Sequence, residues 1–182
     1  MKRFFRLVKP HSRKKSVIFE QKYIYSFSQI EDKVKALHET NTEAAAAVAL
    51  SWLGLSRDEL KTLRVSDYNS TMRMLHSAGR VVYVREDLIA DMLKAICEEA
   101  PEYSMGFFIT DVNSAYEAAE KQELSPISVL KMRYFYEKHS AKLSGEPEDR
   151  VFLKEILRSV GESEADMEKQ FAEYEKDAPE KI

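Results

Sequence analysis

Two arginines occupy positions at which they could bind an anion. Arg133 follows Val129 by four residues and precedes Tyr136 by three, so it shares the apolar face of a predicted helix. An arginine on an inward face must find an anion or several acceptors, because an unpaired buried charge is costly. One hypothesis is a phosphate ligand in a cleft, and the alternative is an ion-paired or snorkelling arginine at the rim of the core.

Arg57 is the second candidate. It lies in the first turn of a predicted helix, close to backbone amides that lack helical partners and favour an anion. The alternative is an exposed arginine that binds no ligand.

Charge is distributed unevenly along the chain, although the formal net charge is only -3. Residues 1–27 are predicted to form a basic arm, 28–176 one domain and 177–182 an acidic tail. From Gly161 to Ile182, eight acidic residues stand against three lysines. The arm would attract DNA phosphates and release counterions, or it is merely a solvated charged terminus. Its basic residues before Glu20 are Lys2, Arg3, Arg6, Lys9, Arg13, Lys14 and Lys15.

Other chemistry receives little support from the sequence. The four histidines are scattered and the five glycines form no phosphate-binding loop, so we expect neither a metal nor a cofactor. The single cysteine, Cys97, lies on an apolar helical stripe and is interpreted as core filler. No apolar run reaches the length of a membrane span, which excludes a membrane role, and a reducing cytoplasm is the expected location.

The predicted fold is mainly α with a small antiparallel sheet. A helix from Ser28 to about His38 has a Ser28–Glu31 capping box, and Thr42 is the predicted N-cap of a buried apolar helix that ends before Gly54. The only plausible hairpin lies between Met72 and Val84. The remaining helices are predicted at 56–63, 86–98, 111–122, 125–143, 148–160 and from 163 onward.

This order of elements resembles the catalytic domain of tyrosine recombinases, the phage integrase family, over about Ser28 to Tyr174. One motif is specific, because the spacing of Gly54, Glu59, Leu60, Leu63 and Asp67 matches Thr-Gly-Leu-Arg-x-x-Glu-Leu-x-x-Leu-x-x-x-Asp. The resemblance implies DNA strand exchange, in which a tyrosine attacks a phosphodiester while two arginines, a lysine and histidines stabilise the phosphate.

The sequence departs from the family at most of these positions. Ser56 stands at the first arginine, with Arg57 one place later, and the hairpin segment 72–80 contains no lysine. Arg133 fits the second arginine, but Leu130 replaces its histidine, and Gly161-Glu162-Ser163 replaces Gly-His-Ser. Tyr174 lies a few residues beyond the expected nucleophile position, which is nearer Phe171. Because losses within one site compound, we expect no catalytic residue.

The sequence therefore predicts an integrase-like DNA-binding protein of phage or mobile-element type without strand-exchange activity. The arm residues and Arg133 would make weak, salt-dependent contacts with DNA. The alternative is an assembly or protein-interaction scaffold, in which the final helix docks Met167, Phe171 and Tyr174 on another copy, although this helix could equally pack on its own domain. A third hypothesis is a residual recombinase that uses Tyr174, Arg133 and Arg57.

Overall fold

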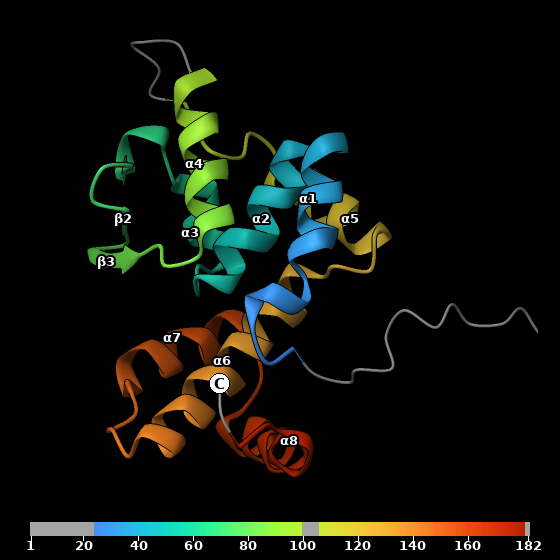
Figure 1. Ribbon diagram of the computed structural model, residues 1–182, viewed down its shortest axis with the longest axis vertical. Helices are drawn as coiled ribbons and strands as arrows, with labels where there is room; N and C mark the ends of the chain where they lie inside the picture. Colours follow the sequence, from blue (N-terminus) through green and yellow to red (C-terminus); the bar gives the residue numbers. More distant parts are fainter. Residues whose placement is uncertain (1–23, 100–105, 181–182) are drawn as a thin grey trace, which may run out of the picture.

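The structure is a computed structural model, and it describes residues 24–99 and 106–180. Most of these residues are helical, and a small sheet lies on one side of the helices (Figure 1). In order, the elements are η1 (Phe27–Gln29), α1 (Glu31–Thr40), α2 (Thr42–Trp52), α3 (Arg57–Thr62), η2 (Val65–Asp67), β1 (Tyr68–Asn69), β2 (Met74–Ser77), β3 (Arg80–Tyr83), α4 (Asp87–Glu99), α5 (Val112–Lys121), α6 (Pro126–Ser144), α7 (Arg150–Val160) and α8 (Glu164–Asp177). The predicted fold class is confirmed.

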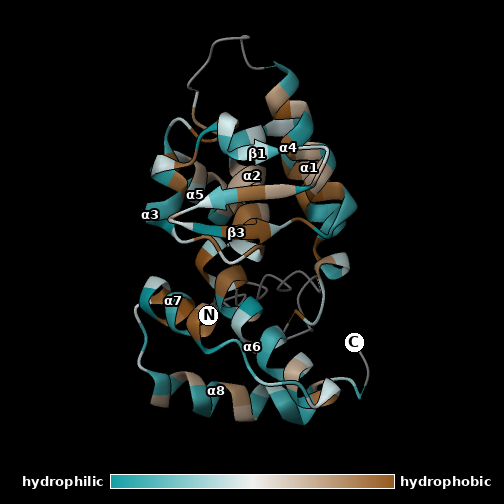
Figure 2. Cartoon of the chain, turned by 90° about the vertical axis from the view of Figure 1, so that its left-hand side faces the viewer, coloured by the Kyte–Doolittle hydropathy of each residue, from teal (hydrophilic) through white to brown (hydrophobic). Residues whose placement is uncertain are grey.

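Helix α2 is the centre of the main core. Every residue from Ala44 to Trp52 is buried, and α1, α4, α5 and α6 pack around the helix. A run of small and apolar residues without a polar face can form a helix only where neighbours cover it on all sides. In Figure 2, α2 lies behind the sheet and is coloured as hydrophobic.

The three short strands form an antiparallel sheet in the order β1-β2-β3. Strands β2 and β3 pair Met74 with Tyr83 and Ser77 with Arg80. The turn between them consists of Ala78 and Gly79, both at positive φ, which suits a two-residue hairpin. The predicted hairpin is confirmed, but Met72 lies before β2 and is 60% exposed.

A second, smaller core lies at the C-terminal end of α6. This 19-residue helix buries Val129 in the main core and, farther along, Phe135 in a cluster that α7 and α8 complete. Met167, Phe171 and Tyr174 of α8 are all buried there. The apolar face of the last helix is therefore occupied by its own domain in this conformation.

Two predicted helix starts are wrong by one or two residues. The capping box is not Ser28–Glu31: the Ser26 amide donates to Gln29 Oε1 at 2.9 Å, and a 3-10 turn precedes α1. The N-cap of α2 is Asn41 and not Thr42, because Asn41 Oδ1 accepts from the Ala44 amide at 2.9 Å. In both places adjacent polar residues offered two competing caps.

Three other predicted N-caps are confirmed, whereas the predicted start of α7 is wrong by two residues. Ser56 caps α3, Asp111 caps α5 and Ser163 caps α8, each by accepting a backbone N–H in the first turn. Helix α7 begins at Arg150 behind its N-cap Asp149, two residues later than the predicted 148.

Candidate functional site: a charge-compensated cleft

A cavity of about 320 Å³ opens beside strand β3 and the first turns of α7. Apolar side chains from Leu53, Val82 and Phe152 contribute to its lining. The charged residues of the lining are Arg80, Arg85, Arg133, Glu86, Glu137, Asp149 and Glu155. Because four carboxylates face three guanidinium groups, the cleft has no positive excess.

Arg133 projects from α6 into an aromatic and acidic surrounding. Its side chain is only 16% exposed, and Nη1 lies 3.8 Å from Glu86 Oε1. Nη2 forms an ion pair with Glu137, one helical turn later. The guanidinium carbon lies 5.3 Å from the Trp52 ring and 5.2 Å from the Tyr136 ring. The charge of Arg133 is compensated within the chain, so a phosphate would have to compete with two carboxylates.

Glu86, which lies just before α4, contacts side chains of α2 and α6. It precedes α4, pairs with Arg133 of α6 and accepts a hydrogen bond from Trp52 Nε1 of α2 at 2.7 Å. A carboxylate shared between an indole N–H and a guanidinium group is fixed in position. Sequence reasoning missed Glu86, whereas the i, i+4 spacing of Arg133 and Glu137 was a visible signal.

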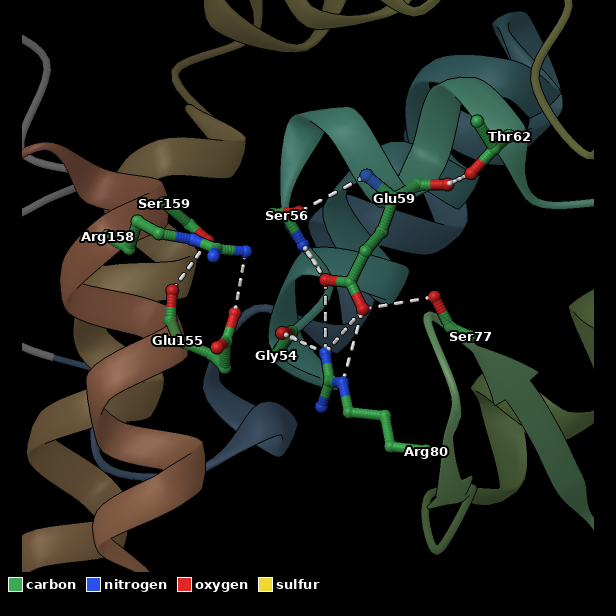
Figure 3. Close-up of polar contacts among 9 residues, drawn as sticks. All are labelled: Gly54, Ser56, Glu59, Thr62, Ser77, Arg80, Glu155, Arg158 and Ser159. Carbon is green, nitrogen blue, oxygen red and sulfur yellow. Dashed lines mark hydrogen bonds and ion pairs between the residues drawn. The ribbon is translucent and has the colours of Figure 1, made fainter.

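A second arginine network fixes the hairpin against α3. Arg80 Nη2 donates to Glu59 Oε1 at 2.9 Å and to the Gly54 carbonyl at 2.9 Å, and Arg80 Nε donates to Glu59 Oε1 at 3.1 Å. Figure 3 shows the guanidinium group held between the carboxylate and the carbonyl oxygen. Ser77 Oγ donates to Glu59 Oε1 at 3.0 Å. Arg80 was not among the predicted site residues, because nothing in the sequence marks the partner of a hairpin arginine.

Glu59 is ionised more readily than an ordinary glutamate. Burial by itself raises the pKa of Glu59, but the Ser56 amide and the Arg80 guanidinium group outweigh burial, so the pKa lies below its usual value. The Ser56 amide donates to Glu59 Oε2 at 2.7 Å, which closes the predicted capping box. The same carboxylate therefore caps α3 and neutralises Arg80.

Phe152 of α7 lies against both arginine networks. Its ring is 5.8 Å from the Arg80 guanidinium carbon and 6.0 Å from that of Arg133. It also packs on Gly54, where an added Cβ would approach Phe152 Cε2 to 2.3 Å. Gly54 has φ +85°, as expected for a left-handed helix stop. Position 54 therefore favours glycine for two reasons: its backbone has positive φ, and a Cβ there would lie too close to the Phe152 ring of α7.

The other two candidates for a residual activity lie elsewhere. Arg57 is exposed on α3, donates from Nη2 to Asn113 Oδ1 at 2.7 Å and lies 4.9 Å from the Tyr116 ring. Tyr174 is 0% exposed and packs in the second core, with its ring centroid 5.4 Å from that of Phe135. Burial raises the pKa of Tyr174 far above its usual value. Neither residue lines the cleft that contains Arg133.

Cys97 is half-buried in α4 and lies 3.8 Å from the Val65 carbonyl oxygen. Burial raises the pKa of its thiol, which lowers the thiolate fraction at neutral pH. These observations fit its interpretation as core filler.

Charge differs strongly between residues 1–23 and the described residues. Residues 24–99 and 106–180 contain 19 Lys and Arg against 29 Asp and Glu, a formal net charge of -10. Residues 1–23 contain eight Lys and Arg and one Glu, a formal net charge of +7. The predicted DNA-binding residues Lys2, Arg3, Arg6, Lys9, Arg13, Lys14 and Lys15 lie outside the described residues.

The described residues also bear on metal binding and on membrane crossing. No group of three or more His, Cys, Asp and Glu side chains among them is arranged to hold a metal ion. No helix in this part of the chain combines the length and apolar composition needed to cross a membrane.

Comparison with known proteins supports the architecture. No protein-family model and no curated protein matches the sequence. Among solved structures, the chain is similar to a XerA recombinase, with a TM-score of 0.51 and 13% sequence identity; the match covers 85% of this chain and 65% of that one. At this identity the likeness shows the fold alone: the described residues share a similar fold with that recombinase, and the chain spans less than two thirds of its length.

Proposed function

We propose that this protein binds DNA through its basic arm and does not exchange DNA strands. The observation that carries the proposal is a recombinase-like fold in which Arg133 is neutralised by Glu86 and Glu137 while Tyr174 is buried in a separate core. A phosphoryl transfer site needs its nucleophile and its cationic ligands to converge on one phosphate. Here the candidates lie on different parts of the molecule.

The charge distribution supports the arm as the DNA-contacting element. The described residues carry a formal net charge of -10 and would be repelled by a polyanion, whereas residues 1–23 carry +7. Contacts confined to lysine and arginine side chains of an arm are expected to be independent of DNA sequence and steeply dependent on salt. The proposal includes a phage or mobile-element origin, which the integrase-like fold favours.

A salt titration tests DNA binding by the full chain. Affinity for a duplex of random sequence is measured by anisotropy between low and moderate salt for the wild type, for Arg13→Ala/Lys14→Ala/Lys15→Ala, and for the control Lys142→Ala/Lys169→Ala/Lys176→Ala. Loss of three phosphate contacts should reduce the slope of log K against log salt by about 2.7. The proposal fails if the wild type does not bind at the lowest salt, or if both triple variants lose the same affinity.

A nicked suicide duplex tests the absence of strand exchange. We expect no covalent protein–DNA adduct with the wild type. An adduct that forms with the wild type and disappears in Tyr174→Phe would show that a residual recombinase site assembles on DNA.

An assembly or protein-interaction scaffold is the second candidate function. It is favoured by the negative charge of the described residues and by the exposed apolar side chains Val81, Tyr83 and Val151, which gather at one cleft. This function predicts that the anisotropy titration shows no binding at any salt concentration.

A further inference from the structure

The two ends of the described chain meet on α8. Near the N-terminal end, the centroid of the Tyr25 ring lies 5.1 Å from that of Tyr174. Near the C-terminal end, Ala178 packs against the second core, and the Pro179 carbonyl oxygen lies 2.8 Å from His139 Nε2 of α6. The His139 and Tyr174 rings contact each other edge to face, with centroids 5.7 Å apart. A continuous set of contacts therefore runs from the C-terminal segment through His139 and Tyr174 to the first described residues.

His139 is buried between two hydrogen-bond acceptors. Its side chain is only 8% exposed. A carbonyl oxygen can only accept, so Nε2 must carry a hydrogen in order to bond to Pro179. The other ring nitrogen, Nδ1, has no hydrogen-bond partner among the described residues and lies 3.9 Å from Glu175 Oε1. In the neutral ring, Nδ1 therefore lies beside a carboxylate and can donate nothing to it. Only the protonated ring offers an N–H to both acceptors.

The charges around His139 favour a cation. Among the described residues, the titratable side chains that contact His139 or lie next to such a contact are Tyr134, Lys138 and Lys142 of α6 and Tyr25, Glu148, Glu168, Tyr174 and Glu175 of the segments packed against it. Lys138 pairs with two of these carboxylates, and Lys142 donates to the third, Glu175, at 2.6 Å. Burial disfavours a charged ring, whereas the excess carboxylate and the Pro179 carbonyl favour one.

We propose that His139 is a pH-sensitive clasp, which holds the C-terminal segment on α6 and tightens when the ring is protonated. A histidine side chain changes its charge between about pH 5 and about pH 8. The added proton on Nδ1 creates an ion pair with Glu175 in the last turn of α8, while the Nε2 hydrogen bond to Pro179 is kept. Because the closed clasp makes a contact that only the protonated ring can make, closure and protonation favour each other. The clasp therefore tightens as the pH falls and loosens as the pH rises.

The same clasp supports the root of the basic arm, residues 24–27. Tyr25 is half-buried and packs against the second core, where its ring contacts Tyr174. Release of the contacts around His139 frees the end of α8 and so weakens the surface against which Tyr25 packs. The consequence for DNA rests on the proposed function, because a fixed root fixes the point from which the arm reaches a duplex.

Hydrogen exchange of the full chain without DNA tests the clasp. Exchange is followed by NMR at about pH 6 and about pH 8 and expressed as protection factors, which remove the intrinsic pH dependence of amide exchange. In the wild type, we expect the amides of the last turn of α8 to be about threefold more protected at the lower pH. His139→Gln keeps an N–H donor for Pro179 but cannot gain a charge, and Glu175→Gln removes the facing carboxylate. In both variants the protection should be the same at the two pH values.

Controls separate the clasp from a general effect of pH. His76→Gln removes a different histidine, which is exposed on β2, and should keep the wild-type ratio. The Gln29 and Ile30 amides donate to carbonyls of the root and should follow the same pH dependence as α8. Equal protection at both pH values in the wild type, an unchanged ratio in His139→Gln, or greater protection at the higher pH would overturn the clasp. A response in α8 without one at Gln29 and Ile30 would overturn its link to the arm. None of these results depends on DNA binding, which the salt titration tests separately.

Discussion

We predict that Arg80→Ala lowers the free energy of unfolding, because it removes the hydrogen bonds between Arg80 and Glu59. The guanidinium group makes three hydrogen bonds to Glu59 and one to the Gly54 carbonyl, and it connects the hairpin to α3. Its removal leaves the Glu59 carboxylate, whose side chain is 13% exposed, without a counter-ion. A carboxylate in that position is poorly solvated by water and loses its main compensating charge.

The magnitude follows from this burial. Removing one partner of a buried ion pair costs about 3–5 kcal/mol. The Arg80 side chain is 27% exposed, and Ser56 and Ser77 still donate to the carboxylate, so part of the penalty is avoided. We therefore expect Arg80→Ala to lower the free energy of unfolding by about 2 kcal/mol.

Urea unfolding monitored by circular dichroism measures this change at constant m-value. Arg73→Ala is the matched control in the same hairpin, because Arg73 and its partner Asp87 have side chains that are 46% and 84% exposed. An exposed pair of this kind contributes about 0.5 kcal/mol or less. Identical urea midpoints for the two variants would refute the inference that the Arg80 network stabilises the fold.

Three further predictions concern the same region. Gly54→Ala should lower the melting temperature more than Gly145→Ala. Both glycines have positive φ, at which an alanine costs about 1–2 kcal/mol, but only at Gly54 would the added Cβ lie against Phe152. Trp52→Phe should lower the free energy of unfolding by about 1–2 kcal/mol by leaving Glu86 without its indole donor; no change in chemical denaturation would contradict this role. Because the pKa of Glu59 is lowered on folding, its ionised form stabilises the protein above the unfolded pKa near 4.5, and this contribution is lost as pH falls through the folded pKa. The stability difference between wild type and Glu59→Gln should therefore shrink as pH falls from 6 to 3, and a constant difference would exclude this linkage.

Local signals in the sequence predicted much of the fold. The Ser56–Glu59 capping box, the Asp111 and Ser163 caps and the glycine stop at Gly54 each involve residues only a few positions apart. Such contacts form within a single turn, so the residue types specify them directly. The two errors, at Ser28 and Thr42, arose where neighbouring polar residues compete for the same cap.

The candidate site was less predictable. No partner of Arg133 was predicted, although Glu137 lies at the i, i+4 position of the same helix. Glu86 precedes Arg133 by 47 positions and reaches it only because α4 and α6 both pack on α2. Glu59 and Arg80 are likewise distant in sequence and meet when the hairpin folds against α3. The burial of Tyr174, which removes it from any cleft with Arg133, depends on the packing of α8 against α6.

The helical class, the buried character of α2, the hairpin and most helix ends could be predicted from the amino-acid sequence, because they follow from periodicity and from contacts within one turn. The tertiary structure was needed to show that Arg133 pairs with Glu86, that Arg80 pairs with Glu59 and that Tyr174 is buried. Pairing and burial depend on the distance between elements remote in sequence, and no local pattern encodes that distance.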